Sequence, residues 1–204
     1  MRRIVKKYSQ FLERSSNTYR AAAKKHDVGC KPGCNECCTV GFFDITLLDA
    51  IHLRAALKDV PEEIRKRVIA KANEQLDVLE KKKAFSRKDP LLKSLPAIDS
   101  ISRRSAKMSC PALDENGGCL VYNQRPHICR IFGPTIRGPR RAVRLEGCGY
   151  FTRDIPEEDF PIYDHYEEEK EMQRAMFKKA GRKRMRAVDT IIPAALTLDL
   201  KKWL

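Results

Sequence analysis

The sequence predicts a mainly α protein, a small helical domain with a loop-rich site held by cysteines. Apolar residues recur at helical spacing in residues 1–29. Two later segments begin with residues that start or cap helices. The cysteine-rich segment 110–149 has many glycines and prolines and little periodicity, and only short strands are expected. These observations together favour helices packed around a loop-rich site.

The first half of the chain contains three expected helices. Residues 1–29 form a basic amphipathic helix. A second helix begins near Thr46, where Thr46 and Asp49 have the form of a capping box, and it runs to about residue 58. Pro61, followed by Glu62 and Glu63, starts a third, because proline and acidic side chains suit the first helical turn. The apolar stripe of the first helix consists of Ile4, Tyr8, Phe11, Leu12 and Tyr19.

The second half is expected to supply a connector, the loop-rich segment and a docking tail. Residues 84–109 form a connector with short helical pieces, 165–186 a charged helix, and 191–204 an apolar tail that docks on the domain. The predicted division is an N-terminal helix at 1–29, a cysteine-cluster metal-binding domain at 30–149, and a charged helix with its docking tail at 150–204.

The composition predicts a cytoplasmic protein without membrane insertion. The chain has 204 residues, of which 42% are hydrophobic and 33% charged. No segment has the apolar length needed to cross a bilayer, and the basic N-terminus lacks the apolar core of a signal peptide. A net charge of +14 indicates an acidic partner, either a protein or a nucleic acid, although basic runs also coat solvent-facing helices.

The eight cysteines fall into two groups and are expected to form one composite metal site. Thiols of a reducing cytoplasm bind metals or do redox work more often than they form structural disulfides. Cys37 and Cys38 are adjacent, so their side chains are expected to diverge and not to share one ion. The first group should then supply some ligands and the second the rest, which couples metal binding to folding. The groups are Cys30, Cys34, Cys37 and Cys38, then Cys110, Cys119, Cys129 and Cys148.

The identity of the metal is narrowed by the spacing in the first group. All-sulfur ligation suits both zinc and iron–sulfur clusters. The pattern Cys30-x3-Cys34-x2-Cys37 resembles that of radical S-adenosylmethionine enzymes, in which three cysteines hold a [4Fe–4S] cluster. The sequence lacks their alternation of strands and helices, and Glu36 stands where they usually have an aromatic residue. An iron–sulfur cluster is favoured over zinc by a small margin.

The second group of cysteines carries a more specific motif. Cys110-Pro111 and the stretch from Cys119 to Arg130 read CP…CxxYxxRPxxCR. With the upstream C-x3-C-x2-CC, this pattern resembles the YkgJ-type cysteine-cluster family of zinc- or iron-chelating domains over residues 30–149. It also resembles part of the flagellin lysine N-methylases, which implies an iron–sulfur cluster in those relatives. Gly133 separates Phe132 from the proline that commonly follows directly, and the rest of the chain does not resemble a methylase body.

Three other residues of the motif are expected at the metal or cofactor. Arg125 and Arg130 are placed to donate charge-assisted hydrogen bonds to thiolate sulfurs, and Tyr122 to pack beside the site. His127 is expected to point outward rather than to bind metal, because eight cysteines already supply enough donors. The remaining histidines have no chelating spacing and are expected at the surface or in the core: His26, His52 and His165.

Three functions follow from these features. The leading interpretation is a cytoplasmic metal-binding protein with an all-cysteine site and a redox or cluster-dependent role. The second is a small methylase-like enzyme that uses a cluster and S-adenosylmethionine. The third is a basic nucleic-acid-binding module with structural zinc. The sequence identifies no catalytic residues and does not decide whether the protein is an enzyme.

Overall fold

The structure is a computed structural model, and the prediction of a mainly helical domain is confirmed. None of the described helices is both long and apolar enough to span a lipid bilayer. The structure describes residues 2–28, 34–39, 41, 43–105, 107–133, 135–138, 144–145, 155–162, 164–182 and 188–203.

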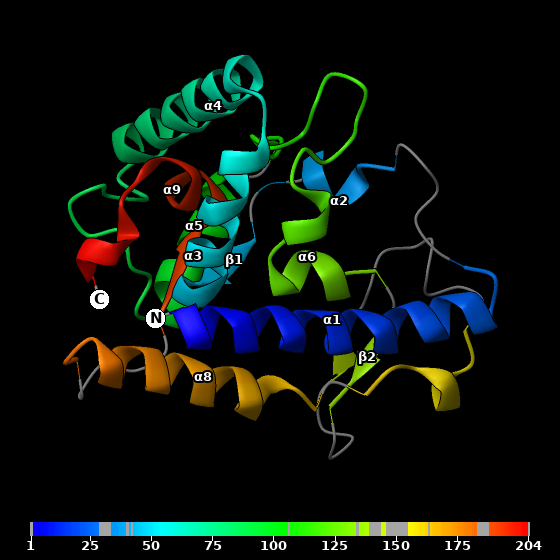
Figure 1. The fold of residues 1–204 in the computed structure, drawn as a ribbon. Coiled ribbons are helices and arrows are strands. Elements are labelled where there is room, and N and C mark those ends of the chain that lie inside the picture. The colour runs from blue at the N-terminus through cyan, green and yellow to red at the C-terminus, as the bar shows by residue number, and fades with distance from the viewer. Residues whose placement is uncertain are drawn as a thin grey trace.

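Two long helices lie side by side and run in opposite directions, α1 (Arg2–Lys25) and α8 (Tyr166–Lys179) (Figure 1). Four of the five residues expected in the apolar stripe of the first helix are buried, with Tyr8, Phe11, Leu12 and Tyr19 all at 3% exposure or less. Ile4 is partly buried and packs against the core. The first turn of α8 contains three glutamates and its last turn two lysines, an order that suits the helix dipole.

Helices α3 (Leu47–Ala56) and α4 (Glu62–Lys81) begin where their start signals indicate. The Thr46 hydroxyl accepts a hydrogen bond from the Asp49 amide at 3.0 Å, which caps α3. This helix ends two residues before the expected position and continues as a 3-10 turn, η1 (Leu57–Asp59). Pro61 immediately precedes α4, whose inner face buries Val68, Ala72, Leu76 and Leu79.

Short elements complete the fold. The connector contains α5 (Leu95–Ser105), and the C-terminal segment contains α9 (Ile192–Thr197) and η4 (Leu200–Trp203). Strand β1 (Asp44–Thr46) pairs antiparallel with β4 (Asp189–Ile191), and β2 (Ile136–Arg137) pairs with β3 (Arg144–Leu145). Two further 3-10 turns are η2 (Tyr122–Gln124) and η3 (Glu157–Asp159). Residues 192–196 of the C-terminal segment are buried.

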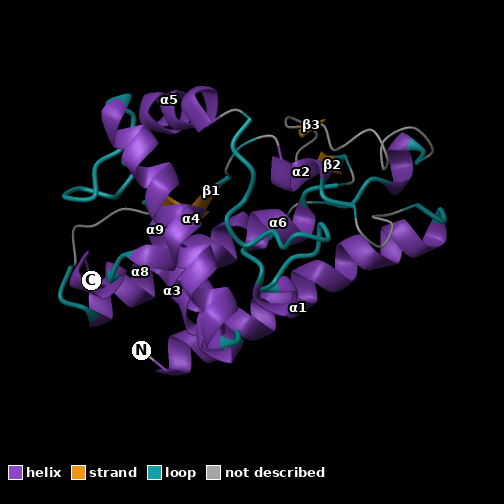
Figure 2. Cartoon of the chain, turned by 90° about the horizontal axis from the view of Figure 1, so that it is seen from above, coloured by secondary structure: helices purple, strands orange, loops and turns teal. Residues whose placement is uncertain are grey.

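The cysteine-bearing elements lie at the edge of the main hydrophobic core. Helices α2 (Glu36–Thr39) and α6 (His127–Ile131) lie to the right of the α3, α4, α5 and α9 group in both views (Figures 1 and 2). Core residues come from α1, α3, α8 and α9, and three partly buried cysteines pack against them: Cys110, Cys119 and Cys129. The core therefore holds these three cysteines in place.

Candidate metal centre

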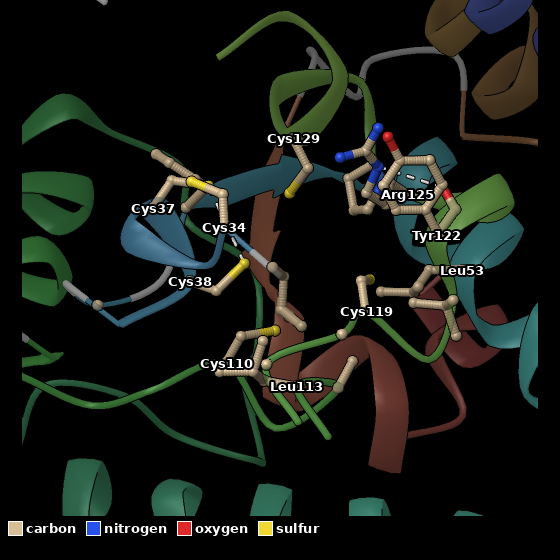
Figure 3. Close-up of a pocket in the computed structure, with 18 residues that line it drawn as sticks. Cys34, Cys37, Cys38, Leu53, Cys110, Leu113, Cys119, Tyr122, Arg125 and Cys129 are labelled. Carbon is tan, nitrogen blue, oxygen red and sulfur yellow. Dashed lines mark hydrogen bonds between the residues drawn. The ribbon is translucent and has the colours of Figure 1, made fainter. Parts of the chain in front are cut away.

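Six cysteines from both halves of the motif line one pocket, which we call the cysteine pocket (Figure 3). Its volume is about 370 Å³. None of the six is paired in a disulfide. Cys30 and Cys148, the two other predicted ligands, lie outside the described residues. The six lining cysteines are Cys34, Cys37, Cys38, Cys110, Cys119 and Cys129.

Cys37 and Cys38 face the same pocket, and the expectation that they diverge is wrong. Both lie in the single helical turn of α2, and their Sγ atoms are 4.0 Å apart. Two thiolates on one tetrahedral zinc ion stand roughly 3.8 Å apart, given zinc–sulfur bonds of about 2.3 Å. The adjacent pair is therefore spaced almost as two ligands of one ion. Extended backbone would have sent the neighbouring side chains to opposite sides, and the turn prevents this.

The main chain joins the two halves directly at the cysteines. The Cys110 amide donates a hydrogen bond to the Cys38 carbonyl at 2.6 Å. The Lys71 ammonium donates to the Cys110 carbonyl at 3.3 Å and so ties this point to α4. Farther along, the Asp114 carboxylate accepts from the Asn116 and Gly118 amides, which shapes the loop that leads to Cys119. These hydrogen bonds to main-chain groups therefore shape the pocket independently of a metal.

The donor set fits a thiophilic metal. Sulfur is the soft ligand that zinc and iron–sulfur clusters prefer, and the described lining contains no carboxylate. Within the described parts of the chain, no group of three or more Cys, His, Asp or Glu side chains is yet close enough to hold an ion. The sulfurs therefore border a common space without converging on one point.

Residues 29–149 match the model of the CxxCxxCC family, whose description is "putative zinc- or iron-chelating domain". The chain belongs to this family. The match covers more than half of the chain and confirms the resemblance stated from the motif. Metal binding is the property that the family description assigns to the domain. No curated protein and no solved structure matches the chain.

In this zinc- or iron-chelating domain, four of the lining thiols, those of Cys37, Cys110, Cys119 and Cys129, have raised pKa values that favour their neutral form. Burial raises the pKa of Cys110 to about 12 and also raises the pKa of Cys119 and Cys129. The pKa of Cys37 is raised first by its hydrogen bond with Cys38 and then by burial. Because a metal binds the thiolate, loading must release these protons.

Arg125 and Tyr122 line the cysteine pocket, whereas Arg130 does not and instead binds the main chain of the 123–125 turn and Ser16. The Arg125 guanidinium lies 3.7 Å from the centroid of the Tyr122 ring, and its positive charge opposes the rise in the pKa of Cys37 and Cys119. Arg130 donates to the Arg125 carbonyl at 2.7 Å, to the Asn123 carbonyl, and to the Ser16 hydroxyl at 3.2 Å. Arg130 therefore fixes the turn that presents Arg125.

His127 is buried, at 2% exposure, so the expectation that it points outward is wrong. Its Nε2 lies 2.7 Å from the Ser15 hydroxyl, and its Nδ1 lies 3.2 Å from Oε2 of Glu169. Its backbone amide donates to Oδ1 of Asp49 at 2.8 Å. The ring faces the long helices because α6 packs against α1, which brings it to these acceptors. It does not line the cysteine pocket.

These contacts belong to a buried polar network of Tyr8, Ser15, Asp49, His127 and Glu169, which we call the Asp49 network. The Tyr8 hydroxyl lies 2.6 Å from Oδ1 of Asp49 and 3.1 Å from Oε1 of Glu169. Burial, together with the neighbouring Glu169 carboxylate, raises the pKa of Asp49 to about 6. The carboxylate expected in the capping box thus serves a different role, because it joins α1, α3 and α6.

Sequence reasoning missed the Asp49 network because its members are far apart in the chain. Asp49 is separated from Tyr8 by 41 positions and from His127 by 78. The local signal at Asp49 was that of a helix cap, and only its hydroxyl half, at Thr46, operates. A buried tyrosine and histidine, each needing a partner, were the available hint.

Proposed function

We propose that the chain binds one metal centre through cysteines from both halves of its motif. The observation that carries this proposal is that six cysteines, from both halves of the motif, line the one cysteine pocket. Membership of a zinc- or iron-chelating family supports it. One zinc ion or one [4Fe–4S] cluster takes four thiolates, and these are drawn from the eight cysteines of the sequence. The candidates are Cys30, Cys34, Cys37, Cys38, Cys110, Cys119, Cys129 and Cys148.

Two identities of the bound metal, an iron–sulfur cluster and a zinc ion, are supported by different observations. The spacing Cys30-x3-Cys34-x2-Cys37 favours a [4Fe–4S] cluster, which would supply electron-transfer or cluster-dependent chemistry. The 4.0 Å separation of the Cys37 and Cys38 sulfurs favours a single ion held by both, and hence zinc. In either case Arg125 offsets part of the negative charge that the thiolates bring into the pocket.

One measurement separates these identities: iron, zinc and acid-labile sulfide per chain after anaerobic purification, with a visible spectrum. A brown protein with iron and sulfide identifies an iron–sulfur cluster, and a colourless protein with zinc identifies a zinc site. A chain that holds neither metal contradicts the proposal.

The composite character of the centre is tested by one substitution in each half. Cys38→Ser and Cys119→Ser should each lower the metal content by at least half, because one centre needs thiolates from both groups. Arg67→Gln, on the exposed face of α4, serves as the control and should keep the wild-type content. Loss of metal from one cysteine variant alone would place the whole centre in one half.

A further inference from the structure

The cysteine pocket is larger than a metal centre needs. Its volume of about 370 Å³ lies within the range of about 300–1,000 Å³ that is usual for small-molecule sites. A zinc ion lies between its sulfur ligands, at about 2.3 Å from each, and so occupies little of such a space. A centre formed at the cysteine end would leave room beside it.

The part of the lining that is not cysteine is mostly apolar. Phe43, Leu53, Val121 and Ile192 contribute to the pocket wall. A pocket of several hundred Å³ with an apolar lining and a few polar groups is the usual form of a small-molecule site. The apolar wall suits the hydrocarbon part of an organic ligand, since covering it releases water.

A single formal charge stands among the described residues of this lining, the guanidinium of Arg125. It is stacked on Tyr122, and its Nε donates to the Tyr122 carbonyl at 3.2 Å. Its two terminal nitrogens have no hydrogen-bond acceptor in the part of the chain that the structure describes. Arg130 donates a hydrogen bond to the Arg125 carbonyl, and this bond helps to fix the position of the Arg125 guanidinium. A planar guanidinium with free terminal nitrogens is suited to a carboxylate.

We propose that the cysteine pocket binds a small organic carboxylate with an apolar body, beside the metal centre. The carboxylate pairs with Arg125, and the apolar body lies along the wall that contains Leu53, Val121 and Ile192. The inference rests on the proposed function only for the metal at the cysteine end. With this ligand site, a small molecule can reach the metal centre, which is then not a closed structural site.

The test uses two probes that differ mainly in charge, 4-phenylbutyrate and the neutral alcohol 4-phenylbutan-1-ol. Each is titrated calorimetrically into the full-length protein, as purified with its metal and after metal removal. The acid should bind at least tenfold more tightly than the alcohol, because a charge-assisted pair adds about that factor. Acetate, which has the charge without the apolar body, should bind more weakly than 4-phenylbutyrate.

Two arginine variants locate the effect. Arg125→Gln should weaken binding of 4-phenylbutyrate about tenfold and leave the alcohol unchanged. Arg67→Gln is the matched control, since this arginine pairs with Glu115 outside the pocket. Equal affinity for acid and alcohol, no binding of either probe, or equal effects of the two variants would each overturn the inference.

Metal analysis of the same samples keeps this inference separate from the proposed function. Metal-loaded protein that fails to bind the acid contradicts the ligand site and leaves the metal centre intact. Protein that binds the acid but holds no metal as purified contradicts the proposed function and retains the ligand site. Binding to the metal-free form alone would show that the centre fills the pocket, and it overturns a ligand beside the metal.

Discussion

The cysteine pocket and the Asp49 network lie on either side of α6 and differ in how their polar groups are hydrogen-bonded. In the network, each side chain is hydrogen-bonded to another member, so the burial of two carboxylates and a histidine is compensated within the protein. In the pocket, the Sγ atoms of Cys37 and Cys38 contact each other. His127 and Cys129 are two residues apart, about 200° around a helix, which explains how α6 serves both regions.

This difference shows which part of the fold is complete without a metal. The Asp49 network stabilises the packing of α1, α3 and α6 by itself, because its donors and acceptors are matched. Among the described residues, the cysteine pocket brings thiols with raised pKa values together without giving them hydrogen-bond partners of comparable strength. Its stability is therefore expected to depend on what binds there, and four experiments test this difference between the two regions.

Metal removal should have the largest effect. Treatment with a strong chelator is expected to lower the melting temperature of the loaded protein by more than about 10 °C, because metal–thiolate bonds contribute directly to folding. Thermal unfolding followed by circular dichroism measures it. The Cys110→Ser variant, which should hold less metal, serves as the control and should respond little to chelator. An unchanged melting temperature in the wild-type protein would show that the pocket is as self-sufficient as the network.

The pH dependence of loading should be the next largest effect. Burial raises the pKa of Cys110 to about 12, and the pKa values of Cys119 and Cys129 are also raised, so each of these thiols is protonated near neutral pH. Below the thiol pKa, each proton released on binding changes the apparent affinity about tenfold per pH unit. Affinity for zinc should therefore rise at least a hundredfold from pH 6 to pH 8 in competition with an indicator chelator. A flat profile would mean that the ligands are already thiolates.

Asp49→Ala should break the network while sparing the metal stoichiometry. It leaves the Tyr8 hydroxyl without its closest acceptor and the His127 amide without its partner, so a loss of about 3 kcal/mol is expected. Urea unfolding measures the change, and Asp59→Ala at the exposed end of η1 is the control. Metal content per chain should stay at the wild-type value. If metal is lost as well, the two regions are not independent and Asp49 also positions Cys129.

Asp189→Asn should give the smallest effect, and it should be stabilising. Burial, and then the charge of Asp44, raise the pKa of Asp189 to about 7, whereas an unfolded aspartate titrates near pH 3.9. The contribution of this group to stability is thus fully present below about pH 4 and is lost as the pH rises through 7. The amide mimics the neutral form, so the variant should be more stable than the wild-type protein, by at least about 1 kcal/mol more at pH 8 than at pH 5. Asp99→Asn, on the exposed face of α5, should show no such difference.

The sequence predicted the parts of this molecule that depend on local patterns. The stripe of Tyr8, Phe11 and Leu12 is buried because helical spacing alone places these residues on one face. The hydroxyl of Thr46 caps α3 because both partners lie within one turn. The cysteine motif, through its family, also predicted that two distant groups belong to one domain.

The remaining features depend on contacts that no local pattern encodes. The direction of Cys38 follows from the helical turn of α2, and four residues are too few for a periodic signal. The partners of Asp49 and the burial of His127 depend on how α1, α3, α6 and α8 pack together. The role of Arg130 was predicted from charge, while its geometry directs it to the 123–125 backbone.

The hydrogen bond between the Cys110 amide and the Cys38 carbonyl has a consequence for how the protein is made. The first cysteine group leaves the ribosome well before the second, since synthesis from Cys38 to Cys129 takes roughly 5 to 20 seconds at ordinary translation rates. During that interval the pocket cannot close, and the early thiols meet oxidants and competing ions without the protection of the folded core. The metal centre can therefore form only after the second cysteine group has been synthesised, when the hydrogen bond between Cys110 and Cys38 brings the two groups together.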